Sequence, residues 1–102
     1  MEEIKLNLND KKRGAFYMEE NGQRTGEIEI GISDNKLVVY HTEVLSEGKG
    51  VAKKLLEAMV DYARKNGLGV VPLCPYVLAQ FKRNPDKYAD IWIKMKPDSN
   101  AH

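Results

Sequence analysis

The stretch "YHTEVLSEGKGVAKKLLEAM", residues 40–59, decides the fold prediction because it joins three local patterns. An apolar, β-branched run ends at residues 41–43, which predicts the end of a strand. A short loop with Gly48 and Gly50 follows, and then an amphipathic helix begins. This order often holds a phosphate group, because a helix N-terminus has free backbone N–H groups and a partial positive charge.

The loop differs from the two common nucleotide-binding motifs. It lacks the Lys-Ser/Thr end of a triphosphate loop, and its glycines do not spell the dinucleotide fingerprint. A tight strand-to-helix turn, in which the glycines serve only the backbone geometry, explains the same residues. The loop alone therefore leaves a phosphate site and a purely structural turn open.

The chain before this stretch predicts an antiparallel meander. Apolar and polar residues alternate in four short segments, which is typical of half-buried strands. Asn21-Gly22 and the Ser33-Asp34-Asn35 segment supply tight turns between them. The four predicted strands cover residues 3–9, 14–20, 24–32 and 36–44.

The chain after the loop predicts a helix and a parallel strand. Apolar residues recur with a 3.6-residue period from Gly50 to Asn66, and Asn66-Gly67 is a good helix stop. Residues 68–74 form a fifth strand, in which Pro72 either interrupts the ladder or lies on an open edge. A strand, a long helix and a strand require a right-handed crossover, so the fourth and fifth strands run parallel.

Two further segments complete the domain. Residues 75–83 begin with Pro75 and suit a short helix, and Asn84-Pro85 ends it. Residues 86–93 form a last short helix or an extended segment that covers the core with Tyr88, Ile91 and Trp92. We therefore expect one mixed α+β, α/β-type domain over residues 1–93, followed by a polar tail over residues 94–102.

Composition excludes several classes of protein. The 102 residues include 16 Lys and Arg against 15 Asp and Glu, a net charge of +1, which argues against a nucleic-acid binder. No apolar run approaches the ~20 residues that span a bilayer, and the N-terminus lacks a signal-peptide core. The single Cys74 excludes an internal disulfide and favours a reducing, cytoplasmic setting. One cysteine and two histidines cannot complete a tetrahedral metal set, so no metal is expected.

Three motifs give the chain a family resemblance. They are His41-Thr42-Glu43-Val44, Glu47-Gly48-Lys49-Gly50-Val51-Ala52 and Pro72-Leu73-Cys74-Pro75-Tyr76-Val77. Over residues 13–93 the chain resembles the short, minimal branch of the GNAT superfamily of N-acetyltransferases. The glycine segment falls on that family's acetyl-coenzyme A motif, with Glu47 standing where the family has Gln or Arg.

The resemblance implies a GNAT-like fold and acetyl-coenzyme A as co-substrate, lying where the fourth and fifth strands splay apart. It implies a pantetheine arm along the end of the fourth strand and a pyrophosphate at the helix start. The residues expected to bind the cofactor are Glu43, Val44, Leu45, Gly48, Lys49, Gly50, Val51, Ala52, Lys53, Pro75 and Tyr76.

Three residues are candidates for the chemistry. His41 and Glu43 are two residues apart on one side of a strand, and either could take a proton from an amine. The alternatives are a structural histidine bonded to a neighbouring strand and a surface carboxylate. Cys74 precedes a helix that starts with proline, a position that makes a thiol more reactive. It could serve as nucleophile or as proton donor to the leaving thiolate, or be a buried, inert cysteine.

The expected function is therefore acetyl-coenzyme A-dependent N-acetylation of an exposed amine, on a small molecule or a protein. Larger family members often protonate the leaving thiolate with a tyrosine, and Phe81 lies near the matching position. A non-catalytic module that binds acyl-coenzyme A is thus the alternative. We expect neither nucleic acid nor membrane as partner, and a monomer or a weak homodimer through an exposed edge strand.

Overall fold

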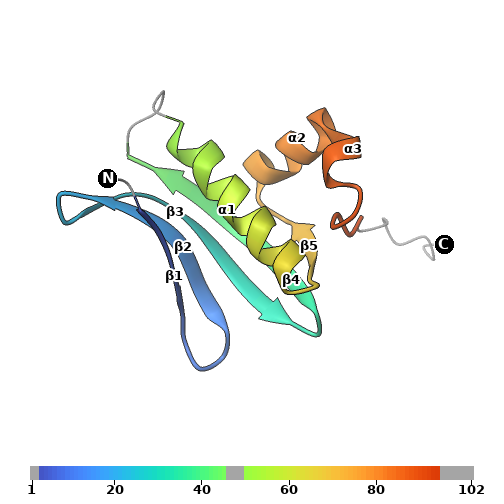
Figure 1. Cartoon of the computed structure of the whole chain (residues 1–102), viewed down its shortest axis with the longest axis horizontal. Coiled ribbons are helices and arrows are strands. Elements are labelled where there is room, and N and C mark those ends of the chain that lie inside the picture. The colour runs from blue at the N-terminus through green and yellow to red at the C-terminus, as the bar shows by residue number, and fades with distance from the viewer. Residues whose placement is uncertain (1–2, 46–49, 95–102) are drawn as a thin grey trace.

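The computed structural model describes residues 3–45 and 50–94 (Figure 1). A single mixed α+β arrangement of five strands and three helices follows the predicted order. The elements are β1 (Glu3–Leu8), β2 (Arg13–Glu20), β3 (Gln23–Ser33), β4 (Lys36–Val44), α1 (Val51–Lys65), β5 (Gly69–Pro72), α2 (Pro75–Arg83) and α3 (Pro85–Tyr88).

The sheet has the predicted topology. Its order is β1-β2-β3-β4-β5, with antiparallel pairs from β1 to β4 and a parallel pair between β4 and β5. Two tight turns have the backbone that right-handed strand twist favours, with positive φ at both central residues. These residues are Asn21 and Gly22 in one turn and Asp34 and Asn35 in the other.

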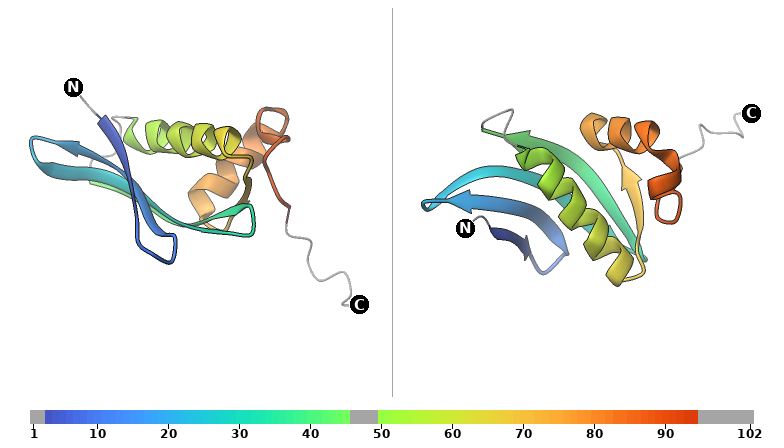
Figure 2. Two further views of the ribbon diagram at one scale, coloured as in Figure 1. Left: turned by 60° about the horizontal axis from the view of Figure 1, so that its bottom comes forward. Right: turned by 45° about the horizontal axis from the view of Figure 1, so that its top comes forward.

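One face of the sheet packs against α1 and forms the core (Figure 2, left). Alternate strand residues and one side of α1 supply it, as the two periodicities predicted. The members of this core cluster on these elements are Phe16, Met18, Ile28, Ile30, Leu37, Val39, Val51, Leu55, Leu56, Met59, Val60, Ala63 and Val70. Val71 and Pro72 of β5 are buried as well. In the described part of the chain, Figure 2 shows no second helix across the opposite face of β2 and β3, which we call the open face.

The C-terminal elements close the β5 edge. Phe81 of α2 stacks on Tyr88 at 4.4 Å between ring centroids and meets Trp92 edge-on at 5.7 Å. Beyond α3 the chain extends along β5, where Val70 N–H donates to Ile91 C=O and Ile93 N–H donates to Val70 C=O. The segment predicted as either a short helix or an extended strand therefore contains both.

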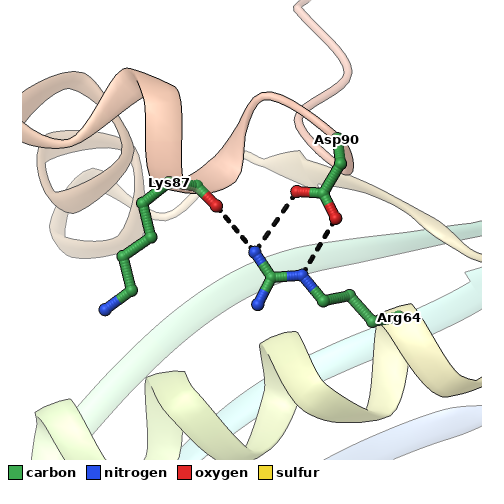
Figure 3. Close-up of polar contacts among 3 residues, drawn as sticks. All are labelled: Arg64, Lys87 and Asp90. Carbon is green, nitrogen blue, oxygen red and sulfur yellow. Dashed lines mark hydrogen bonds and ion pairs between the residues drawn. The ribbon is translucent and has the colours of Figure 1, made fainter.

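An ion pair holds this segment against α1 (Figure 3). Arg64 Nε donates to Asp90 Oδ2 at 2.9 Å. Arg64 Nη2 donates both to Asp90 Oδ1 and to the Lys87 C=O. Such a bidentate pair fixes both partners more strongly than a single contact does. It joins the last turn of α1 to the turn after α3.

The fifth strand is shorter than predicted, because β5 ends at Pro72 and not at residue 74. The N–H groups of Leu73 and Cys74 both donate to Val39 C=O, so the chain leaves the ladder there. Both polar groups of Val70 face the outer edge, and alternation gives Pro72 the same direction. Pro72 is buried, and its nitrogen faces the side of β5 away from β4, so the missing N–H breaks no bond of the β4–β5 ladder. The predicted edge position is therefore confirmed, but the edge is covered and not open.

No helix of the described residues is long and apolar enough to cross a membrane. These residues also contain no group of three or more metal-binding side chains that could hold an ion. Of the predicted polar tail, only Lys94 belongs to the described chain.

Candidate functional site

A β-bulge in β4 shapes the candidate site. Glu29 pairs with His41 and Ile30 pairs with Val39, so Tyr40 has no partner of its own on β3. An extra residue in one strand shifts the alternation by one and exchanges the faces of all later side chains. Without the bulge, the inward positions Leu37 and Val39 would continue to His41.

The bulge places His41 and Glu43 on the open face. Their partners Glu29 and Glu27 point there, because residues directly opposite each other share a face. Both side chains are exposed, and neither has a polar partner among the described residues. The prediction that they share one side of the strand is confirmed, and the described chain offers no neighbouring group that would make His41 a bonded structural histidine.

Thr42 points the other way, into the core face, where it meets Cys74. The two atoms Thr42 Oγ1 and Cys74 Sγ lie 3.2 Å apart. Cys74 is the N-cap residue of α2 and is 2% exposed. The predicted position at a helix start and the buried setting both hold, but the structure brings Cys74 next to Thr42 and not next to His41 or Glu43. Sequence patterns missed Thr42, because only the bulge turns it inward.

The main chain of β4 diverges from β5 beyond Val39. Pairing between the two strands covers only residues 36–39 and 69–72. Leu45 N–H donates to Thr25 C=O, so Leu45 is bonded to the β3 side. In an antiparallel pair only every second residue bonds the neighbouring strand, so the N–H and C=O groups of Thr42 and Val44 point away from β3. An extended ligand can bond such groups as a neighbouring strand would. Glu43 and Leu45, which were predicted for this role, turn their main chain toward β3.

A hollow of about 180 Å³ lies at the same end of β4. The three predicted residues Glu43, Val44 and Leu45 line it together with Arg24, Gly26 and Glu27. Leu45 is 64% exposed. Three of the predicted cofactor residues therefore border one concave surface.

The start of α1 provides free backbone donors. Gly50 is the N-cap with φ 71°, a left-handed conformation that favours glycine, and no side chain of the described residues caps the helix. A Cβ at Gly50 would meet no atom within 4 Å. Of the predicted phosphate-binding residues, Val51 is buried, Ala52 is half-buried and Lys53 is exposed. Gly48 and Lys49, with Glu47, lie outside the described residues.

The first turn of α2 carries the remaining predicted residues. Pro75 begins the helix beside Cys74, and Tyr76 is half-buried. Burial raises the pKa of the Tyr76 phenol, and the nearby Tyr88, Cys74 and Glu57 add to the rise. Tyr76 therefore keeps its proton at neutral pH. Phe81 is fully buried in the core and cannot donate a proton.

Comparison with known proteins identifies one matching family and several solved structures with a similar fold. The model of the family described as GCN5-related N-acetyl-transferase matches residues 15–91. The solution structure of a GCN5-like candidate N-acetyltransferase from Staphylococcus aureus is 27% identical with a TM-score of 0.67, and the match covers 96% of each chain. A search of curated proteins found no match to this chain.

Two larger enzymes share the fold. Ribosomal-protein-alanine N-acetyltransferase from Brucella melitensis biovar Abortus 2308 is 21% identical with a TM-score of 0.60, covering 89% of this chain and 70% of that one. Nourseothricin acetyltransferase is 25% identical with a TM-score of 0.50, covering 65% and 42%. The similarity in length to the staphylococcal protein distinguishes this chain from both.

Proposed function

The chain belongs to the GCN5-related N-acetyltransferase family, and we propose that it transfers the acetyl group of acetyl-coenzyme A to an exposed primary amine. The observation that carries this proposal is the divergence of β4 and β5 beyond Val39, directly beside the uncapped start of α1. Ligands of open α/β sheets bind beyond the carboxyl ends of parallel strands, which is this place.

The donor would bind along the core-face side. The outward main-chain groups of Thr42 and Val44 suit the amides of a pantetheine arm. The N–H groups of residues 51–53, which have no partner within residues 3–45 and 50–94, suit a pyrophosphate. Lys53 is exposed in the first turn of α1 and adds a positive charge there. The absence of an acidic side chain from that turn favours an anion as well.

The acceptor would approach from the open face. His41 and Glu43 lie there, exposed and without polar partners in the described chain, so either can take a proton from the amine directly or through a water. The amine nitrogen then attacks the thioester carbonyl, the C–S bond breaks, and the coenzyme A thiolate leaves. Cys74 and Tyr76 are the two groups at the start of α2 that can return a proton to that thiolate.

Thermal unfolding with coenzyme A and acetyl-coenzyme A tests the ligand. A ligand at 100 times its Kd stabilises the native state by about 2.7 kcal/mol. NAD and ATP at the same concentration serve as controls. No stabilisation by either coenzyme A form at millimolar concentration contradicts the proposal.

Turnover with a panel of amines tests the reaction. We expect thiol release that depends on the amine. Stabilisation without turnover on any amine would instead favour an acyl-coenzyme A-binding module. The buried Phe81, which stands in place of a proton-donating tyrosine, would then explain the lack of turnover.

A further inference from the structure

An apolar groove with a positively charged rim runs beside the end of β5. Its volume is about 440 Å³. Leu73, Leu78, Trp92 and Ile93 form its apolar part, and Lys82 and Lys94 stand among them. Leu73 is 51% exposed, so a large aliphatic side chain at this place is left largely in water.

The groove exists because nothing in the described chain continues the sheet there. Residues 91–93 pair with β5 only around Val70. The next outward position is Pro72, which has no N–H to offer, so a further strand cannot extend the ladder. The groove is therefore a surface for side chains and not a site for strand addition.

The groove opens on the same face as His41 and Glu43. A Cβ at Gly69 would overlap the Ile93 side chain, so Ile93 covers the face of β5 that Gly69 shares with Leu73. This is the face of the sheet opposite α1, because Val70 lies in the core, and on β5 it is covered at Val71 and exposed at Leu73. The Leu73 N–H donates to Val39 C=O at 3.0 Å, where β4 and β5 diverge. The groove thus begins at the proposed acetyl-transfer site.

The charges differ on the two sides of that site. Lys82 has no ion-pair partner among the described residues and lies one turn after Leu78 on the same side of α2. Lys94 Nζ lies 4.9 Å from the centre of the Trp92 ring. On the β3–β4 side, Glu43 faces Glu27, which pairs with Arg24 at 2.8 Å, so Glu43 is the carboxylate without an ion pair among the described residues. An ammonium group is therefore favoured near β4, and a carboxylate is favoured near the groove.

We propose that this groove, defined by Leu73, Leu78, Lys82, Trp92, Ile93 and Lys94, binds the acceptor through a segment next to the acetylated amine, and that this segment is an apolar residue followed by acidic residues of a polypeptide. The inference rests on the proposed function, because it treats the groove as the acceptor side of the same site. The amine meets His41 and Glu43, the apolar side chain covers Leu73 and Leu78, and carboxylates meet the two lysines.

The single tryptophan makes the groove directly observable. Trp92 is the only tryptophan of the chain and lines the groove, so a ligand in the groove should change its fluorescence. The probes are three synthetic peptides with one lysine and one leucine, followed by two glutamates, two glutamines or two lysines. We expect the glutamate peptide to bind about 10-fold more tightly than the lysine peptide, a difference of about 1.4 kcal/mol. Added salt should reduce this difference.

Charge-reversal variants locate the effect. Lys82→Glu and Lys94→Glu should each remove the preference for the glutamate peptide. Lys11→Glu, an equal charge change in the exposed turn between β1 and β2, should keep it. In the acetylation assay the groove variants should raise KM for the glutamate peptide and leave kcat unchanged.

The inference is overturned if Trp92 shows no response to any peptide at millimolar concentration, or if all three peptides bind with equal affinity. A preference that survives both groove variants overturns it as well. Thermal stabilisation by acetyl-coenzyme A is measured on the same proteins and should be unchanged by the groove variants. Its absence from the wild type would count against the proposed function, whereas the peptide titration alone decides the groove.

Discussion

Thr42 Oγ1 lies 3.2 Å from Cys74 Sγ and joins β4 to the start of α2 beyond the last main-chain pair of β4 and β5. The hydroxyl holds the thiol against the core face of β4, where the proposed thioester would lie. Because the two residues are 32 positions apart in the chain, the contact also fixes how α2 leaves the sheet.

Replacing Thr42 separates the hydrogen bond from the shape of the side chain. Thr42→Val keeps the shape and removes the hydroxyl, so we expect a loss of about 1 kcal/mol in the free energy of unfolding. Thr42→Ser keeps the hydroxyl and should retain the contact. If Cys74 returns the proton to the leaving thiolate, kcat should fall in Thr42→Val and in Cys74→Ala, and should be largely retained in Thr42→Ser. Full turnover in Cys74→Ala would leave the cysteine a packing role only.

His41 and Glu43 are tested by His41→Gln and Glu43→Gln. Loss of a general base typically lowers the rate 10²- to 10⁴-fold, so the residue that takes the amine proton should show a fall in kcat of about this size. Both side chains are exposed, so thermal stability should change little. Glu20→Gln, an exposed carboxylate at the end of β2 with no ion pair among the described residues, is the matched control. Normal kcat in both variants would remove both residues from the chemistry.

Most of the fold follows from local sequence signals. β4 and α2 have the predicted bounds, because turn residues flank β4 and Pro75 begins α2 while Asn84-Pro85 ends it. The end of β5 was placed two residues too late. β5 ends there because the N–H groups of Leu73 and Cys74 both donate to Val39 C=O, a convergence that no sequence pattern marks.

The candidate site was less predictable, because it depends on the bulge at Tyr40. No glycine or proline marks the bulge in the sequence, and it arises from the register between β3 and β4. Spacing correctly grouped His41 with Glu43. Only the register shows that this pair faces away from Cys74 and that Thr42 faces toward it.

The start of α1 is tested by Gly50→Ala. A left-handed residue with a Cβ costs roughly 1–2 kcal/mol, so the variant should be destabilised by about that amount. It should also weaken binding of coenzyme A, because the helix start must reorganise. Gly67→Ala, with φ 64° at the other end of α1 and equally open surroundings, is the matched control. It should show the same loss of stability and unchanged coenzyme A binding. Equal effects of both variants on binding would contradict a phosphate site at Gly50.

The ion pair between Arg64 and Asp90 predicts a dependence of stability on pH (Figure 3). The hydrogen bond from Arg64 lowers the pKa of the Asp90 carboxyl below its ordinary value of 3.8. In the range between the folded and the unfolded pKa, the unfolded state binds more protons, so stability rises with pH. The contribution of Asp90 is therefore fully present above about pH 4 and is lost as the pH falls through the lowered pKa.

Urea unfolding of the wild type and of Asp90→Asn at pH 7 and pH 3 checks this sign. The variant should be less stable than the wild type at pH 7, and the difference between the two should shrink at pH 3. Both side chains are largely exposed, so the effect should be modest and should decrease with salt. Asp86→Asn, a neighbouring carboxylate of α3 with no ion pair among the described residues, should not reproduce the pattern. A difference that is the same at both pH values would show that Asp90 acts through its shape and its neutral hydrogen bonds, and not through its charge.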